Sequence, residues 1–429
     1  MSGDVRPALP PLSLSRDPSF RRFWAGEAIS LLGSQITTLA LPLSAVILLD
    51  AGPAEMAILG LLSYLPFLVV TLPAGVWVDR HRRRPLLLIA NIGRGMALVA
   101  IPVSAWLGVL TLPLLYGVAL VVGILTVIFE VAYLAYVPHL VSRDRLTDAN
   151  ARLQATSSAT DVAGPGIAGL LIAAVGAPVA ILIDSASYLA SAVLLLGIRR
   201  PEPEPGGAGR PVDIVGDIRA GLRLTFTHPI LRAFALEATT NNLAWQVVEV
   251  VLLIYATKVL GLDALAIGAF FTLGAVGSVL GALAAGPIAR RLGVGRTITG
   301  AMVLCGAGTL LVPLAAPPPL LGAAILAVAL FLGGFGTTVS NVHVVTVRQT
   351  ITPDDLLGRM NASYRTLTYG AIPVGALIGG LLGETLGLQA TMAVGAVGVF
   401  LAPLWVLFSP VPGLRDVATF PRVHERSAA

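Results

Sequence analysis

Three ionisable residues, Arg94, Glu130 and Asp161, lie well inside apolar stretches of the sequence. Charged side chains are costly in an apolar environment, and those that occur there usually serve a function. An arginine beside two acids is neutral overall when one acid carries a proton, so such a group can bind and release a proton. We predict that Glu130 or Asp161 carries this proton and that Arg94 is its partner. A static structural ion pair is the alternative.

A second set of polar residues could line a cavity for a small molecule. Glu249 could meet a cation, whereas Glu27 is close enough to Arg21 and Arg22 to reach the end of its apolar stretch. Broad apolar contact with a few hydrogen bonds suits an amphipathic organic molecule. The cavity candidates are Glu27, Gln35, Asn241, Asn242, Trp245, Glu249 and Tyr369. Asp184 and Arg365 also stand in apolar stretches, without an assigned role.

The sequence shows no pattern for enzymatic chemistry. It has no GxxxxGK[ST] loop, so ATP is not expected as the direct energy source. We find neither a cluster of metal ligands nor a nucleophile with a base. We therefore expect no enzyme, no metal and no cofactor, and a proton gradient as the source of energy.

The apolar stretches dominate the composition. Of the 429 residues, 56% are hydrophobic and 12% charged, whereas soluble globular proteins carry about 25% charged residues. A soluble fold could not bury this much apolar surface, but a lipid bilayer can. We therefore predict an all-α integral membrane protein. The first 20 residues lack the apolar core of a signal peptide, so we expect the first helix to insert uncleaved.

A membrane-spanning helix needs about 20 mostly apolar residues, and twelve stretches meet this requirement. They cover residues 22–46, 56–78, 85–107, 112–136, 151–174, 178–198, 231–255, 264–288, 297–314, 319–346, 361–385 and 388–409. At about 1.5 Å per residue, Arg94, Glu130 and Asp161 would share one layer of the membrane. The long connection, 199–230, begins as a flexible linker. It continues as an amphipathic helix that lies on the membrane surface or is an ordinary solvated connector.

The basic residues predict the orientation in the membrane. Of the 28 Lys and Arg residues, Arg94 and Arg365 lie within spans, and Lys258 alone lies in a connection on one side. All the others lie in the tails and connections of the opposite side. Basic residues favour the cytoplasmic face. We therefore expect both termini in the cytoplasm, and this topology explains the positive charge without a nucleic-acid partner.

The second half of the sequence repeats features of the first half. An offset of 211 residues relates three pairs: Gly75 and Gly286, Asn150 and Asn361, and Gly169 and Gly380. A constant offset across separate loops and helices indicates an internal repeat. We predict a six-helix bundle at 1–198, a linker with a surface helix at 199–230, and a second bundle with its tail at 231–429.

Two motifs resemble those of a known family. The stretch GVWVDRHRRRP resembles the signature between the second and third helices of the major facilitator superfamily, and is carried here by Gly75, Asp79, Arg80 and Arg83. The stretch DVAGPGIAG resembles the fifth-helix signature of its exporters, carried here by Gly164, Pro165 and Gly169. FRRFWAGEAISLLGSQI and FEVAYLAYVPHLV are similar to the drug and siderophore efflux branch, which includes macrolide exporters and the enterobactin exporter.

The resemblance implies a major facilitator fold, in which two pseudo-symmetric six-helix bundles rock about a central cavity. It implies that Asp79 faces the positive N-terminus of the eleventh helix, near Asn361, and bridges the halves when the cytoplasmic side is shut. Arg80 and Arg83 would pair with acids or with lipid phosphate. Alternatively, Asp79 only caps its own loop.

The fifth-helix motif would interrupt the backbone hydrogen bonds and allow a close approach to another helix. The partner we expect is the eighth helix, with a small-residue face of Gly274, Gly277, Gly281 and Gly286. A passive kink is the alternative.

We thus predict a monomeric secondary transporter of the bacterial cytoplasmic membrane. Its partners would be a small-molecule substrate, protons and the lipid bilayer, and its function the proton-coupled export of drugs or other lipophilic molecules. A narrow siderophore or metabolite exporter, a nutrient uptake carrier and a non-transporting sensor are alternatives.

Overall fold

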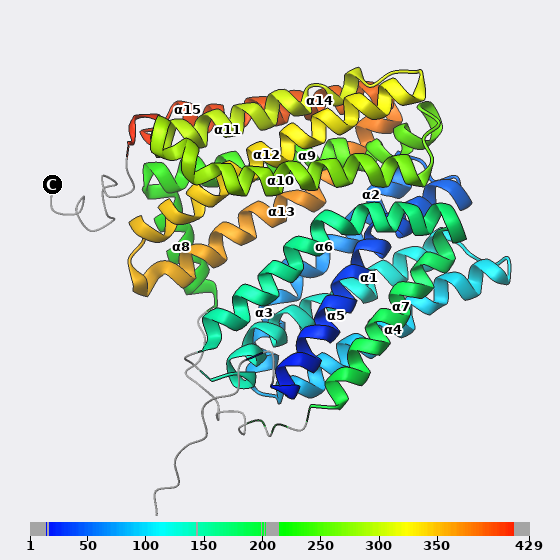
Figure 1. Ribbon diagram of the computed structural model, residues 1–429. Coiled ribbons are helices and arrows are strands. Elements are labelled where there is room, and N and C mark those ends of the chain that lie inside the picture. Colours follow the sequence, from blue (N-terminus) through cyan, green and yellow to red (C-terminus); the bar gives the residue numbers. More distant parts are fainter. Residues whose placement is uncertain are drawn as a thin grey trace, which may run out of the picture.

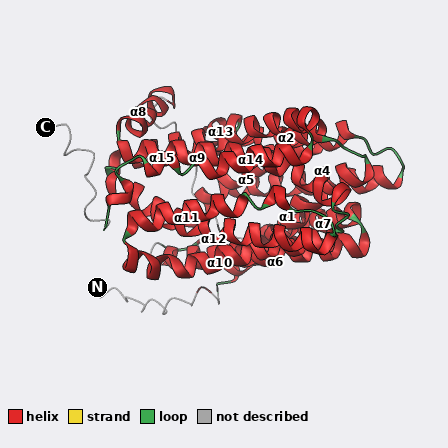
Figure 2. Ribbon diagram, turned by 90° about the horizontal axis from the view of Figure 1, so that it is seen from above, coloured by secondary structure: helices red, strands yellow, loops and turns green. Residues whose placement is uncertain are grey.

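The computed structural model describes residues 14, 17–142, 145–198, 200, 202 and 214–415, and in these residues all regular secondary structure is helical (Figures 1 and 2). The first half comprises α1 (Pro18–Leu48), α2 (Pro53–Val69), α3 (Thr71–Asp79), α4 (Arg83–Trp106), α5 (Leu112–Leu140), α6 (Leu146–Val175) and α7 (Ala177–Leu196). The second half comprises α8 (Ile214–Thr227), α9 (Pro229–Ile254), a π-helical turn (Tyr255–Val259), α10 (Ala264–Leu292), α11 (Val294–Thr309), α12 (Pro319–Ile351), α13 (Asp354–Leu386), α14 (Leu388–Leu401) and α15 (Leu404–Leu407).

The helices confirm the prediction of twelve membrane crossings. In the described part of the chain, eleven helical segments are long and apolar enough to span a bilayer. The shorter apolar helix α2 continues into α3 after Val70, whose N–H still donates to the carbonyl of Pro66. Together α2 and α3 make the remaining crossing.

Two helices begin five or more residues earlier than the hydropathy predicted. The eleventh crossing, α13, starts at Asp354, so Asn361 lies about two turns inside the helix rather than at its N-terminus. The fifth, α6, starts at Leu146. Both helices open with a polar segment, which a search for apolar stretches overlooks. The N-terminus that the resemblance assigned to Asp79 as a partner is therefore displaced from Asn361.

Most arginines gather at one end of the bundle, which we call the arginine-rich end; it carries residues 80–84, the start of α6, helix α8 and residues 290–293. Several of them bind the C-terminal carbonyls of α7. Arg84 donates to Leu195 O at 3.1 Å and to Leu196 O at 2.8 Å, and Arg22 donates to Gly197 O. Cations are favourable at helix C-termini because the unpaired carbonyls there carry partial negative charge.

The two halves touch through equivalent pairs of helices. Gly169 of α6 packs on α10, where an added Cβ would lie 2.5 Å from Ala264 O, and Gly380 of α13 packs on α2, where it would lie 3.0 Å from Pro53 O. These glycines are one of the pairs related by 211 residues. Gly176 and Gly387 have the same offset; they follow α6 and α13 with φ of 82° and 83°.

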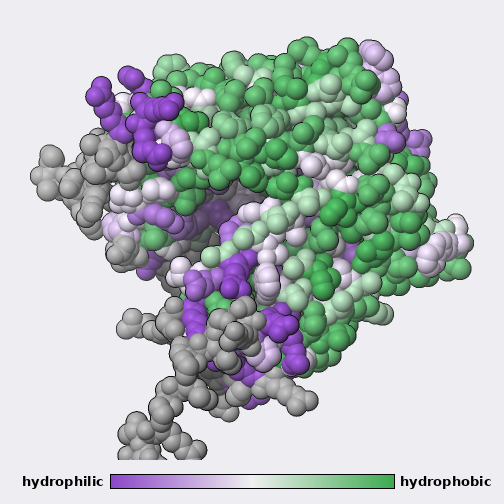
Figure 3. Space-filling view, in the orientation of Figure 1, coloured by the Kyte–Doolittle hydropathy of each residue, from purple (hydrophilic) through white to green (hydrophobic). Residues whose placement is uncertain are grey.

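The apolar core is continuous between the halves only away from the arginine-rich end. There, Leu43 of α1 and Val251 of α9 belong to one cluster. At the arginine-rich end, Phe23 belongs to a cluster of the first half and Phe234 to a separate cluster of the second. Figure 3 shows the resulting hollow, lined by hydrophilic residues and opening at the end that carries α8.

Polar contacts close the end opposite the arginines. Lys258 Nζ lies 2.5 Å from Asp50 Oδ1, which joins the π-helical turn of the second half to the loop before α2. Glu384 Oε1 accepts a hydrogen bond of 3.2 Å from the N–H of Ala54, at the start of α2. The molecule is therefore open at the arginine-rich end and shut at the other.

Candidate functional site

A cavity of about 920 Å³ lies inside the bundle. Helices α1, α2, α4, α5, α6 and α7 supply most of its wall, and α9 and α10 of the second half complete it. The wall extends from Asn150 and Gln154, near the arginine-rich end, to Leu41 and Met56, near the closed end. The cavity is thus placed between the halves and within the membrane-spanning part.

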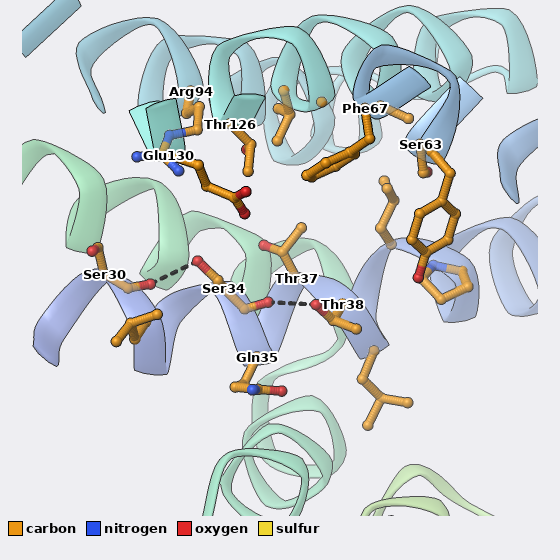
Figure 4. Close-up of a pocket in the computed structure, with 18 of the residues that line it drawn as sticks. Ser30, Ser34, Gln35, Thr37, Thr38, Ser63, Phe67, Arg94, Thr126 and Glu130 are labelled. Carbon is orange, nitrogen blue, oxygen red and sulfur yellow. Dashed lines mark hydrogen bonds between the residues drawn. The ribbon is translucent and has the colours of Figure 1, made fainter. Parts of the chain in front are cut away.

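Helix α1 presents a stripe of hydroxyl groups to the cavity (Figure 4). Ser30, Ser34, Thr37 and Thr38 recur at helical spacing, so they share one face of the helix. Ser34 and Thr38 each donate to the carbonyl four residues earlier, at 2.8 Å. Ser34 Oγ also lies 2.8 Å from the hydroxyl of Tyr188. The hydroxyls are therefore satisfied without a ligand, yet their oxygens can still accept a hydrogen bond.

Arg94 is buried in the cavity wall, where two aromatic rings contact its guanidinium. Its guanidinium carbon lies 4.3 Å from the ring centroid of Phe129 and 4.2 Å from that of Tyr188. It also donates to Asn91 Oδ1, and Asn91 Nδ2 in turn donates to Ser191 Oγ at 3.0 Å. Each stacked ring contributes about 0.5–2 kcal/mol. These contacts fix the arginine in place.

Two acids of the cavity wall lie within electrostatic reach of Arg94, as does Asp184 of α7 outside the wall. Glu130 of α5 projects beside it on the same side of the cavity (Figure 4). Glu27 of α1 is buried and also lines the cavity. Glu130 Oε2 lies 3.6 Å from Nη2 of Arg365, which belongs to α13 in the second half. The structure therefore gathers one buried acid, one accessible acid and a fixed arginine on one wall.

The predicted third member of this group, Asp161, lies elsewhere. Its side chain is exposed outside the cavity, and its Oδ1 accepts a hydrogen bond of 2.8 Å from Gln35 Nε2. Gln35 itself lines the cavity, as predicted. Glu27, which was predicted as a cavity residue, takes the place of Asp161 beside Arg94 and Glu130.

The second half contributes one acid to the cavity, Glu249 of α9. It lies near Trp245 on its own helix and near Tyr64, which lines the cavity from α2. Phe67 and Phe271 add aromatic surface to the same cavity. The arrangement offers apolar and aromatic contact together with a carboxyl group.

Four other predicted cavity residues lie outside its wall. Asn242 Nδ2 donates to Thr368 O at 2.9 Å and so joins α9 to α13. Trp245 packs against the apolar core, and Tyr369 lies under Arg365 with 5.2 Å between the ring centroid and the guanidinium carbon. Asn241 sits beside Asn242 on α9.

The latch, by which we mean the predicted contact of Asp79 with the N-terminus of the eleventh helix, lies only partly within the described residues. The side chain of Asp79 lies outside the described part of the structure, so its contact with α13 stays a prediction. Gly75 lies on α3, and Arg80 is exposed just after that helix. The backbone N–H of Arg83 donates to Glu202 Oε2 at 2.6 Å, so a linker acid caps the start of α4.

The fifth-helix motif makes the predicted close approach to the eighth crossing, α10, but at other residues than the glycines expected there. A Cβ on Gly164 would lie 2.5 Å from Gln35 Cγ, and Pro165 lines the cavity. Gly169 meets Gly268 of α10, where the two backbones are too close for a Cβ. The glycines expected at this contact face α12 or their own helix instead: Gly274, Gly277 and Gly281 pack on Leu330, Phe331 and Phe335, and Gly286 lies near Arg290.

Sequence reasoning missed the hydroxyl stripe of α1 and the aromatic rings around Arg94. The spacing of Ser30, Ser34 and Thr37 was a usable signal, because residues three and four apart share a helix face. No spacing in the sequence indicates that the rings meet Arg94, because Phe129 and Tyr188 belong to two other helices, α5 and α7.

Twelve crossings around a central cavity define a membrane transporter for small molecules rather than an enzyme. The chain belongs to the transmembrane secretion effector family of the major facilitator superfamily, whose family model matches residues 8–428.

Two curated relatives are exporters by name. The chain is 27% identical to the multidrug efflux pump Tap of Mycolicibacterium fortuitum, over 91% of this chain and 95% of that protein. It is 25% identical to the enterobactin exporter EntS of Salmonella typhi, over 92% of each. Both alignments cover nearly the full length of the two proteins compared.

Solved structures support the same fold. A bacterial homologue of the iron transporter ferroportin, in an inward-facing state, superposes with a TM-score of 0.73 at 19% identity, over 92% of this chain and 98% of that one. The nucleoside transporter NupG has a TM-score of 0.72 at 12% identity, over 91% and 98% of the respective chains. At these identities the likeness concerns the fold alone.

Proposed function

We propose that the chain is a proton-coupled exporter of lipophilic, cationic small molecules in the bacterial cytoplasmic membrane. The observation that carries the proposal is the cavity itself: its wall holds three acids, Glu27, Glu130 and Glu249, but a single arginine, Arg94. Such a wall favours cations. The likeness to a protein named as a multidrug efflux pump supports export.

The orientation expected from the basic residues is compatible with export. Basic residues favour the cytoplasmic face, so the arginine-rich end would face the cytoplasm together with both termini. The hollow would then open inward, and a substrate would enter from the cytoplasm or the inner leaflet. Alternating access would carry it out when the halves rock and the end closed by Lys258 and Asp50 opens.

The cavity is suited to a drug-sized organic ligand. Small-molecule sites usually measure about 300–1,000 Å³ and combine apolar walls with a few polar groups. Here Phe67, Phe271 and Tyr64 supply flat apolar surface, and the hydroxyls of α1 supply hydrogen-bond acceptors. Broad contact of this kind accepts ligands of several shapes.

Glu130 is the acid best placed to carry the proton. It is 47% exposed and faces the open hollow, so water can reach its carboxylate. Arg94, fixed beside it by Phe129 and Tyr188, favours the charged form after the proton leaves. The proton gradient would replace a cofactor as the source of energy.

Everted membrane vesicles test this function directly. With tetraphenylphosphonium as probe, an imposed proton gradient should drive its uptake, and a protonophore should abolish the uptake. Glu130→Gln should remove the driven uptake but retain exchange of labelled for unlabelled probe, because exchange needs no net proton movement. Asp148→Asn, which removes an exposed acid outside the cavity, is the matched control and should pump normally.

Three outcomes would contradict the proposal. Normal pumping by Glu130→Gln would remove the proton assignment. Greater accumulation of the probe in intact cells that contain the chain than in cells that lack it would indicate uptake instead of export. Binding without flux in either direction would indicate a sensor.

A further inference from the structure

An ion pair joins the two halves on the open side of the molecule. Arg365 of α13 and Glu130 of α5 approach to 3.6 Å between Nη2 and Oε2. Their side chains are 52% and 47% exposed, so both reach the water of the hollow. Arg365 is also steadied by the ring of Tyr369.

The pair lies where the hollow meets the cavity. Glu130 is ten residues from the end of α5 at Leu140, and Arg365 is eleven residues from the start of α13 at Asp354. At 1.5 Å per residue, both are about 15 Å from the arginine-rich end. Glu130 lines the cavity and Arg365 stands just outside it. A substrate entering from the hollow therefore passes this pair.

We propose that Arg365 determines the charge selectivity of the cavity by competing with a cationic substrate for Glu130. The inference rests on the proposed cationic substrate class. While Arg365 neutralises Glu130, the other acids of the wall are Glu27 and Glu249. When Arg365 is displaced, a third carboxylate becomes available to the ligand.

The two arginines near Glu130 differ in how easily they can be displaced. Arg94 is buried, in contact with two aromatic rings and hydrogen-bonded to Asn91, so it stays in the wall. Arg365 is half-exposed, and ion pairs in such positions are weak, because water screens the charges. A lipophilic cation can therefore replace Arg365 at modest cost.

Displacement of Arg365 has a mechanical consequence. The inter-half polar contacts of Lys258 and of Glu384 described above lie at the closed end. A cation bound at Glu130 would thus release α13 from α5 on the open side. Substrate binding would then be linked to the movement of the halves.

Binding of two ions of equal shape and opposite charge tests the inference. The purified full-length chain in detergent is titrated by calorimetry with tetraphenylphosphonium and with tetraphenylborate. Arg365→Gln should bind the cation about 1.5- to fivefold more tightly, as expected for loss of a weak competing ion pair. Its affinity for the borate anion should not rise. Arg365→Lys, which keeps the charge, should resemble the wild type.

The Glu130→Gln background supplies the decisive comparison. If Arg365 acts through Glu130, adding Arg365→Gln to Glu130→Gln should leave the cation affinity unchanged. Arg291→Gln removes an exposed positive charge at the arginine-rich end and is the control for net charge. An equal gain in Arg291→Gln, a gain that persists in the Glu130→Gln background, or no gain in Arg365→Gln would overturn the inference.

The outcome is separable from that of the proposed function. Binding is measured without a membrane or a gradient, so a chain that fails to pump can still show the predicted competition. A chain that pumps the cation but shows no effect of Arg365→Gln would refute the inference alone. A wild-type chain that does not bind the cation would refute both the inference and the substrate class.

Discussion

Two arginines in the membrane-spanning part are held in opposite ways, and this difference organises the site. Arg94 is buried against the rings of Phe129 and Tyr188, whereas Arg365 forms a half-exposed ion pair with Glu130. A fixed charge can adjust the proton affinity of a neighbouring acid, and a displaceable charge can respond to a ligand. The carboxylate of Glu130 lies beside both arginines.

The sequence could predict part of this site. Arg94 and Glu130 were recognisable because charged residues are rare in apolar stretches. The role of Arg365 was not, since nothing in the spacing of residues shows that α5 and α13 meet. Asp161 carried the same signal as Glu130, but it faces Gln35 outside the cavity.

The pair of Lys258 and Asp50 predicts how closure depends on pH. The hydrogen bond from Lys258, and then its charge, hold the pKa of Asp50 below its usual value of 3.8. A group with a lowered pKa contributes fully above its ordinary pKa, and the contribution is lost only as the pH falls through the lowered value. This contact should therefore be equally intact between about pH 5 and pH 8.

Cysteine labelling checks this expectation. A cysteine at Leu41, deep in the cavity, is placed in a Cys305→Ser background and exposed to an impermeant maleimide from the closed end. Lys258→Gln should raise the labelling rate about two- to fivefold at every pH in that range, and Lys258→Arg should not. The ratio of the Lys258→Gln rate to the wild-type rate at each pH cancels the pH dependence of the thiol itself. A ratio that changes steeply within the range would argue against the assignment.

At the scale of helices, single glycines set the distance between the halves. The backbones of α6 and α10 meet at Gly169 and Gly268, and those of α13 and α2 meet near Gly380. The repeat in the sequence predicted the equivalence of Gly169 and Gly380, because the same 211-residue offset recurs elsewhere. It could not identify the partner glycine, which depends on how the helices cross.

A methyl group at Gly169 should separate α6 from α10. Its Cβ would lie 2.5 Å from Ala264 O and 2.9 Å from Gly268 Cα. Both are backbone atoms, so they cannot move away by a change of side-chain rotamer. Overpacking of this kind costs about 1–3 kcal/mol, so Gly169→Ala should lower the thermal unfolding midpoint in detergent and slow transport. Gly300→Ala, with nothing within 4 Å, is the control. Equal midpoints for the two variants would contradict the packing argument.

Helix boundaries show where hydropathy stops being informative. The apolar stretches located all twelve crossings, because the bilayer demands them. They misplaced the start of α13, since its first two turns are polar and project beyond the apolar part. This displacement matters for function, because a latch at Asp79 would have to meet a helix end near Asp354 rather than Asn361.

At the scale of the whole molecule, the described conformation is one of the two that transport requires. The apolar core joins the halves at one end and divides at the other. The composition and the repeat predicted two bundles, but they could not tell which end is open. Which end is open depends on the relative strength of the contacts between the halves, such as Lys258 with Asp50 and Arg365 with Glu130.

The central claim is that the halves rock, so that one end opens as the other closes. Spin labels can report both ends by pulsed electron–electron resonance, with one pair at His81 and Arg291 on the arginine-rich end and another at Val109 and Leu320 on the opposite end. Across conditions with and without tetraphenylphosphonium and at different pH, the distance within the first pair should shorten whenever that within the second lengthens. Distances that stay constant, or that change in the same direction at both ends, would contradict the account.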